Sequence, residues 1–338
     1  MKTFRPIYVA FLLTALRVMA HAQGNDSEDQ PTQPNKKLES VIGTPSLAFP
    51  KAKKVTIITG ARFSYPLVQK WIDRYNLVNP NIQIIIESRG STDPAQYDIL
   101  AEVYEQEEEI KKDREYINVA RYAILPVAND KSAFAKNYAD KGLNKALINQ
   151  VFFHDLYAEK EDIKKIKAPY TVYTRLQKAG VPIVFTKYFG FEQKDIKGKA
   201  IAGADEHLLK ALLRDSTGVS YLPLALIYDL ASKKPLNGIA VLPVDLNGNG
   251  RINDDEKFYD NLEKVIQRLE HAQAEEIHNI PMAYLHLSFD KAKAGPETID
   301  FLKWIIENGQ SDLHEFGYLQ PEADSNAKVK VSFASKDK

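Results

Sequence analysis

The chain of 338 residues contains no cysteine. It therefore has no disulfide framework, no thiolate nucleophile, and no cysteine that could carry a lipid anchor after a leader segment.

An excess of either charge is also lacking, because 45 lysines and arginines balance 45 aspartates and glutamates. Such a balance gives no reason to expect a nucleic-acid-binding surface. Apolar residues make up 44% of the chain, which is ordinary for a globular protein and excludes wholesale disorder. The length exceeds what one core normally serves, so we expect two lobes.

Long apolar runs are missing, and the only candidate is the short run Ile7–Ala15 near the start. Lys2 and Arg5 precede it, and the small-x-small sequence Ala20-His21-Ala22 follows it. This order is typical of a secretory signal peptide, and the run is too short to span a bilayer as a helix. We expect a signal peptide over 1–22, no membrane span in the mature chain and a periplasmic location.

Catalytic motifs are absent as well. The sequence has no G-x-S-x-G elbow, no Walker-type phosphate loop and no nucleophilic cysteine. These absences argue against an enzyme and for a binding protein.

One motif is present whose spacing follows coordination chemistry, within residues 242–259. Asp245, Asn247, Asn249, Gly250, Ile252 and Glu256 match positions 1, 3, 5, 6, 8 and 12 of an EF-hand calcium loop. Side-chain oxygens at alternate positions can surround one cation, Glu256 can add two oxygens, and Arg251 would offer its backbone carbonyl. The sequence therefore predicts a Ca²⁺ site, with an Asn/Gly-rich turn as the alternative.

The surroundings of this loop differ from those of a calcium sensor. An apolar, strand-like run, Gly238–Val244, precedes the loop where a sensor has a helix, and only 255–274 reads as helical. Two carboxylates and two amides predict weak binding, on the order of 10⁻⁴ to 10⁻³ M. We interpret the loop as a structural clip.

Apolar patterns then divide the chain into two α/β lobes. Residues 23–53 are polar and rich in proline, which is typical of a flexible linker, and 321–338 form a polar tail. Strand-like runs at 54–59, 82–87 and 97–103 and a helical pattern at 67–78 begin lobe I. Two strands that each end in Leu-Pro-Val, 119–127 and 238–244, bracket the segment between them. We predict lobe I over 54–125 and 239–320, and lobe II over 126–238.

Motifs spread over 54–319 match one known family. They are Thr59-Gly60-Ala61 with Ser64, Tyr65, Pro66 and Trp71; Gly90-Ser91; Asp98; Tyr173-Thr174-Arg175; Val241 to Gly250; and Phe301 to Trp304 with Gly309, Gln310, Gly317 and Tyr318. On these motifs the chain resembles the phosphate-type periplasmic solute-binding proteins of ABC importers, specifically a subset with a calcium-like loop.

The resemblance implies an α/β, two-lobe type II periplasmic-binding fold with two hinge strands, closing around a tetrahedral oxyanion. It implies a monomer that serves the permease of an ABC importer. The implied ligand residues are Thr59, Gly60 and Ser64 in the first loop, Ser91 in the second, Asp98 and Arg175. Asp98 would accept the proton of hydrogen phosphate, and Arg175 would form a charge-assisted pair with the anion.

The sequence departs from the family at one informative place. The family follows its arginine with a Ser-Gly-Thr run, whereas Arg175 is followed by Leu176 to Gly180. Two hydroxyl ligands are therefore missing. This leaves an alternative function open: a secreted, calcium-stabilised interaction or signalling module that keeps the fold but carries no solute.

Overall fold

One nine-stranded mixed sheet organises the chain, in the order β2-β1-β3-β9-β4-β7-β5-β6, with β8 paired to β4. The computed structural model describes residues 55–88, 93–104, 106, 108–154, 166, 168–273 and 276–322. The predicted signal peptide and linker, Ser91 and all but the first two residues of the tail predicted at 321–338 lie outside these ranges. The strands are β1 (Val55–Gly60), β2 (Gln83–Ile86), β3 (Ile99–Glu102), β4 (Arg114–Asn129), β5 (Thr171–Arg175), β6 (Lys199–Ile201), β7 (Gly218–Pro223), β8 (Ile239–Val241) and β9 (Met282–Asp290).

Nine α-helices lie in the described ranges. They are α1 (Tyr65–Val78), α2 (Glu108–Lys111), α3 (Ala133–Tyr138), α4 (Lys145–Phe152), α5 (Gly180–Phe189), α6 (Asp205–Arg214), α7 (Leu224–Ile227), α8 (Leu262–His271) and α9 (Pro296–Trp304). The predicted strands at 54–59, 82–87, 97–103 and 119–127 are confirmed as β1, β2, β3 and part of β4. None of the described helices is long and apolar enough to cross a membrane.

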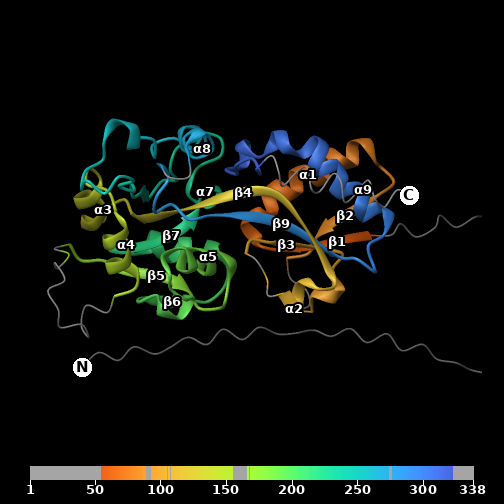
Figure 1. Ribbon diagram of the computed structural model, residues 1–338, viewed down its shortest axis with the longest axis horizontal. Helices are drawn as coiled ribbons and strands as arrows, with labels where there is room; N and C mark the ends of the chain where they lie inside the picture. Colours follow the sequence, from red (N-terminus) through yellow and green to blue (C-terminus); the bar gives the residue numbers. More distant parts are fainter. Residues whose placement is uncertain are drawn as a thin grey trace, which may run out of the picture. The chain divides into compact units, whose positions relative to one another are not determined.

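The long strand β4 belongs to both lobes (Figure 1). Its first part, 114–123, pairs with β9, and 124–128 pairs with β7, both antiparallel. Side chains alternate across a strand, so Ala123 and Leu125 face one core cluster while Tyr122 and Ile124 face another. Both faces are buried, which explains why the run is apolar throughout rather than alternating.

The two lobes repeat one strand pattern. Lobe I has the order β2-β1-β3-β9-β4, and lobe II has the order β6-β5-β7-β4-β8. In each lobe the first three strands in this order are parallel to one another, and the last two are joined by antiparallel pairing. The fold is thus the two-lobe α/β arrangement expected from the sequence.

The predicted return crossing at Gly238–Val244 is placed differently by the structure. Its β8 portion pairs with 127–129 of β4 inside lobe II, and Val244 forms a parallel bridge with Leu143. Residues of the calcium-type loop and α8 pack in the same cluster as Ile239. The chain rejoins lobe I only through β9. An apolar run is equally typical of an inner strand of one lobe and of a strand that crosses between lobes. The pattern therefore could not reveal that residues 242–281 come before the strand that returns to lobe I, β9.

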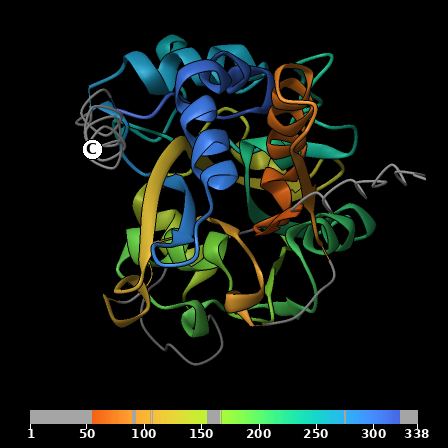
Figure 2. The ribbon, with the colours of Figure 1, turned by 90° about the vertical axis from the view of Figure 1, so that its right-hand side faces the viewer.

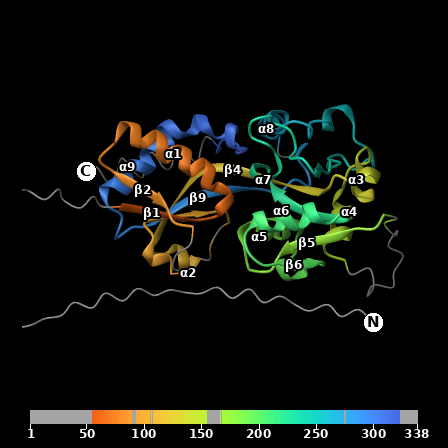
Figure 3. The same ribbon diagram turned by 180° about the vertical axis from the view of Figure 1, so that it is seen from behind.

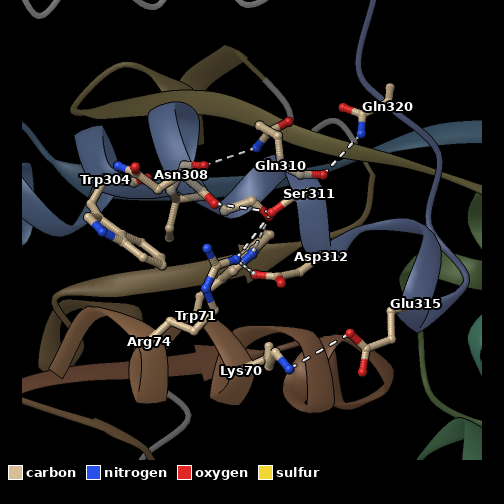
Figure 4. A network of polar contacts seen from close by, with 12 residues as sticks. Lys70, Trp71, Arg74, Trp304, Asn308, Gln310, Ser311, Asp312, Glu315 and Gln320 are labelled. Atoms are coloured by element: carbon tan, nitrogen blue, oxygen red, sulfur yellow. Dashed lines mark hydrogen bonds and ion pairs between the residues drawn. The ribbon is translucent and has the colours of Figure 1, made fainter. Parts of the chain in front are cut away.

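The helices α1 and α9 lie together on one side of the lobe I strands (Figures 1 and 2). Trp71 of α1 donates its Nε1 hydrogen to the Gly309 carbonyl at 2.8 Å, and a Cβ on residue 309 would lie 2.8 Å from that nitrogen. Arg74 pairs with the nearly buried Asp312 at 2.5 Å and lies 5.4 Å from the Trp304 ring (Figure 4). These contacts fix the C-terminal segment against α1.

This network gives a test of stability with an internal control. Arg74→Ala should lower the free energy of unfolding by about 1–3 kcal/mol, because it removes a charge-assisted hydrogen bond to a nearly buried carboxylate. Lys70→Ala removes only the exposed 3.7 Å pair with Glu315 and should cost less than about 1 kcal/mol. Urea unfolding measures both, and equal effects would contradict the assigned role of Arg74.

Candidate functional site

A cavity of about 370 Å³ lies between the first loop of lobe I and the ends of β5, α5 and α6 in lobe II. In the view from behind, α5 and α6 lie on the side of lobe II nearest to lobe I (Figure 3). The lining residues are Gly60, Ala61, Arg62, Phe63, Val103, Arg175, Gln177, Ala179, Gly180, Val181, Gly203, Ala204 and Asp205. Of the residues predicted for the ligand site, this cavity gathers Gly60 and Arg175.

Arg175 is the last residue of β5 and its side chain is only 13% exposed. One terminal nitrogen, Nη1, donates to Asp205 Oδ1 at 2.9 Å. The Nε group is buried and has no hydrogen-bond partner among the described residues. The guanidinium thus keeps donor capacity beyond its ion pair, at the wall of the cavity.

Asp205 is the carboxylate of this cavity, and sequence reasoning missed it. It is the first residue of α6 and is 8% exposed. Burial raises the pKa of the Asp205 carboxyl, although the guanidinium of Arg175 acts in the opposite direction. The acidic first turn of a helix was the available signal, but such a turn is common and says nothing of a partner 30 residues away.

Two helices begin at the cavity. α5 starts at Gly180 and α6 at Asp205, and the residues before them, Ala179 and Ala204, have no side chain that accepts a hydrogen bond; their own N–H groups donate to Gln193 Oε1 (3.1 Å) and His207 Nδ1 (3.0 Å). The first N–H groups of a helix have no partner within the helix, and the macrodipole makes this end positive. The cavity therefore combines two arginines with the positive ends of two ten-residue helices, which is an environment that suits an anion.

The lobes touch beside this cavity. A Cβ placed on Gly180 of α5 would lie 2.2 Å from Val103 Cγ2 and 3.1 Å from Tyr104 Cδ1. Only a residue without a side chain allows α5 to approach lobe I so closely.

Side-chain amides hold the segment that replaces the family's Ser-Gly-Thr run. Gln193 donates from Nε2 to the carbonyls of Arg175 (3.1 Å) and Gln177 (2.9 Å), and its Oε1 accepts from Ala179 N (3.1 Å). Gln177 Oε1 in turn accepts from Gly203 N at 3.1 Å. The turn after Arg175 is thus fixed without the missing hydroxyls.

In the first loop, Gly60 lines the cavity, whereas the side chains of Thr59 and Ser64 hold the loop in place. Gly60 has φ +134°, and a Cβ there would lie 2.1 Å from the Ala101 carbonyl oxygen, so only glycine fits. Thr59 Oγ1 donates to Glu87 O at 2.7 Å, and the fully buried Ser64 donates to Ala61 O at 2.7 Å. Both hydroxyls bind backbone and hold the loop. Arg62, to which the sequence assigned no role, lines the cavity.

Asp98 lies elsewhere. Its Oδ2 accepts from Ile57 N at 2.8 Å, and the residue lines a separate small cavity with Arg114 and Lys293. The structure thus does not bring Asp98 next to Arg175. A short turn, Pro94–Gln96, comes just before Asp98, and the Asp98 carboxylate accepts its hydrogen bond from the backbone of β1.

The loop predicted to bind calcium curls around the side chain of Asp245. The buried Asp245 carboxylate accepts from Gly248 N (2.7 Å), Asn249 N (3.2 Å) and Gly250 N (2.8 Å). Gly248 and Gly250 have φ of +75° and +82°, the left-handed region that favours glycine.

The two ends of this loop meet. Glu256, 1% exposed, accepts from Leu246 N (2.7 Å) through Oε1 and from Asn253 N (2.9 Å) through Oε2. Asn247 and Asn249 each accept, through Oδ1, from the N–H two residues further on, at 3.0 Å in both cases. No group of three or more His, Cys, Asp or Glu suited to a metal ion occurs among the described residues, so ligands here would include amide and carbonyl oxygens.

Backbone hydrogen bonds attach the loop to lobe II. Ile252 N donates to Asp140 O at 2.8 Å, and Asp245 N donates to Leu143 O at 3.2 Å. A Cβ on Gly142 would lie 2.4 Å from Ile252 Cδ1 and 2.9 Å from Asp245 N. The loop is therefore an integral part of lobe II, and none of its residues lines the Arg175 cavity.

Solved structures with the same fold exist. A protein from Clostridium perfringens, described as a phosphate ABC transporter substrate-binding protein with bound phosphate, is similar with a TM-score of 0.59 and 13% identity over 80% of this chain and 100% of that one. An ABC-type phosphate transport receptor from Vibrio cholerae gives a TM-score of 0.53 and 12% identity over 79% and 100%. No protein-family model and no curated protein sequence matches the chain. The chain has the type II periplasmic-binding fold, and these neighbours are binding proteins rather than enzymes.

The Arg175–Asp205 pair predicts a pH dependence of stability. Because the pKa of Asp205 is raised in the folded state, the folded protein binds more protons than the unfolded chain at pH values above the ordinary carboxyl pKa of about 4. The contribution of this group to stability therefore falls as pH rises through that window. Asn does not titrate, so the free energy of unfolding of Asp205→Asn minus that of the wild type should increase between pH 4 and pH 7.

Asp215→Asn provides the opposite case. Hydrogen bonds from Thr217 lower the pKa of Asp215, so its contribution is present above the ordinary pKa and is lost as pH falls. For this variant the same difference should decrease as pH rises toward the ordinary carboxyl pKa of about 4, and it should change little above that pH. Urea unfolding at several pH values measures both, and slopes of equal sign would contradict the assignment.

Proposed function

We propose that the chain is a periplasmic solute-binding protein that captures phosphate or a related oxyanion in the Arg175 cavity and delivers it to the permease of an ABC importer. The observation that carries this proposal is the position of Arg175, nearly buried at the cavity wall with an Nε group that has no hydrogen-bond partner in the described part of the chain. The starts of α5 and α6 open on the same space.

Each group has a physical role in this proposal. Arg175 provides the charge-assisted hydrogen bonds, and its planar guanidinium suits two oxygens of one anion. The first N–H groups of α5 and α6 supply further donors. Arg62 adds positive charge from lobe I, and Gly60 lets the first loop approach. Thr59 and Ser64 hold that loop in place.

Asp205 takes the place proposed for Asp98 at the sequence level. A carboxylate beside an anion is repulsive unless a proton lies between them. Hydrogen phosphate carries such a proton at neutral pH and sulfate does not. Asp205 would therefore favour phosphate over sulfate, and it also orients Arg175 through their 2.9 Å hydrogen bond.

Calorimetry tests the proposal. Phosphate should bind the wild type, and Arg175→Ala should weaken binding about 10- to 100-fold, since it removes charge-assisted hydrogen bonds in a nearly buried site. Arg214→Ala is the matched control, because Arg214 is exposed at the opposite end of α6, and it should bind as the wild type does. Heats that are absent for every oxyanion in the wild type would sink the transport function and favour the interaction module.

We further propose that the loop 245–256 holds Ca²⁺ as a structural ion. Supporting it are two buried carboxylates, Asp245 and Glu256, at the two ends of the loop and the amide oxygens of Asn247 and Asn249 at alternate positions between them. The ion would join the loop to the segment 140–143, and so strengthen lobe II rather than take part in solute binding.

Calcium at millimolar concentration should raise the melting temperature of the wild type by several degrees, since a ligand that binds only the folded state stabilises it. Asp245→Ala should abolish that rise. Asp254→Asn, an exposed side chain of the same loop at a position without ligand role, should retain it. If millimolar calcium leaves the melting temperature of the wild type unchanged, the metal site is refuted.

A further inference from the structure

The wall of the Arg175 cavity has few polar side chains. Among the described lining residues only Arg62, Arg175, Gln177 and Asp205 carry polar side chains, and none carries a hydroxyl. The remaining lining residues are Gly60, Ala61, Phe63, Val103, Ala179, Gly180, Val181, Gly203 and Ala204. A free tetrahedral anion has four oxygens to satisfy on all sides, so the side chains of this wall supply few of the donors that it needs.

The wall combines charged and apolar side chains. Arg175, Gln177 and Asp205 come from the end of β5 and the segments before and at the starts of α5 and α6, and Arg62 comes from the first loop of lobe I. Phe63 and Val103 of lobe I and Val181 of α5 supply the larger apolar side chains, and all three are at least 95% buried. The cavity therefore offers both charged groups and apolar side chains to a ligand.

The Phe63 side chain is held in place by aromatic neighbours. Phe63 is stacked on Tyr318 with ring centroids 6.3 Å apart and meets the edge of Tyr122 at 5.4 Å. Tyr318 also donates its hydroxyl hydrogen to the Phe63 carbonyl at 3.2 Å. A preformed apolar wall of this kind is a binding surface for hydrocarbon, because it need not rearrange when it is covered.

The cavity also has room for a ligand larger than an inorganic ion. The lobes already touch at Gly180 and Val103, yet about 370 Å³ remain. Pockets of about 300–1,000 Å³ are typical of organic ligands.

Resting on the proposed function, we infer that the solute is an organic oxyanion: an anionic head bound at Arg175, joined to an apolar body that lies against Phe63, Val103 and Val181. The head satisfies the donors of lobe II, and the body covers these apolar side chains. Inorganic phosphate would satisfy the first part only.

Calorimetry on the full mature chain tests this inference with ligands that share one head. The probes are inorganic phosphate and the monoesters methyl, propyl and pentyl phosphate. Affinity should rise along the series by about fourfold for each CH₂ group that is buried. Carboxylates of the same chain lengths form a second arm, which shows whether the head is a phosphate ester or a carboxylate.

Two variants on one helix separate the body from the head. Val181→Thr places a hydroxyl in the apolar wall and should reduce the preference for pentyl over inorganic phosphate by at least about threefold. Val184→Thr makes the same change three residues further along α5, where Val184 lines a different cavity, and should leave that preference unchanged. Melting temperatures of both variants confirm that they are folded.

The possible results decide between the two proposals. Inorganic phosphate that binds more tightly than every ester and carboxylate overturns the organic solute and leaves the oxyanion site standing. An absence of binding for all probes in the wild type overturns the proposed function itself. A chain-length dependence that Val181→Thr weakens, and Val184→Thr does not, supports the inference.

Discussion

The structure depends on a single strand, β4, that is hydrogen-bonded in both lobes. Its first ten residues pair with β9, and the following ones pair with β7 on one side and β8 on the other. Because the ladder is continuous, the position of lobe II relative to lobe I is set by the twist of this strand and by the bulge between Asn118 and Ala120. The other strands of lobe I join the sheet through β9, and those of lobe II join it through β7 and β8.

The cavity follows from that arrangement. The repeated strand order brings the end of β1 in lobe I and the end of β5 in lobe II toward each other, and each strand is followed by a turn and a helix start. Polar groups of two lobes thus meet where backbone N–H groups are unsatisfied, which is the usual place for ligands in α/β folds. The Gln193 side chain fixes the turn after Arg175 by three hydrogen bonds.

The sequence predicts the elements of the fold better than their connections. Apolar periodicity locates β1, β2, β3, β4 and α1, because their burial leaves a regular pattern. It could not place the crossing back to lobe I, since β8 and a crossing strand have the same composition. For the site, Arg175 and Gly60 followed from motifs, whereas Asp205 and Gln193 become visible only when turns 18 to 30 residues apart are folded together. Asp98 shows the converse. The order of the motifs along the chain predicted Asp98 as a ligand residue, but its carboxylate binds the backbone of β1.

The most direct test of the account is a crystal structure of the protein grown with arsenate, a phosphate analogue whose arsenic atom is located by anomalous scattering. The account predicts an anomalous peak in the Arg175 cavity between the two lobes. The arsenate oxygens should lie within hydrogen-bond distance of Arg175 and of the first N–H groups of α5 and α6. A cavity without arsenic, or arsenic bound only at other places on the protein, would contradict it.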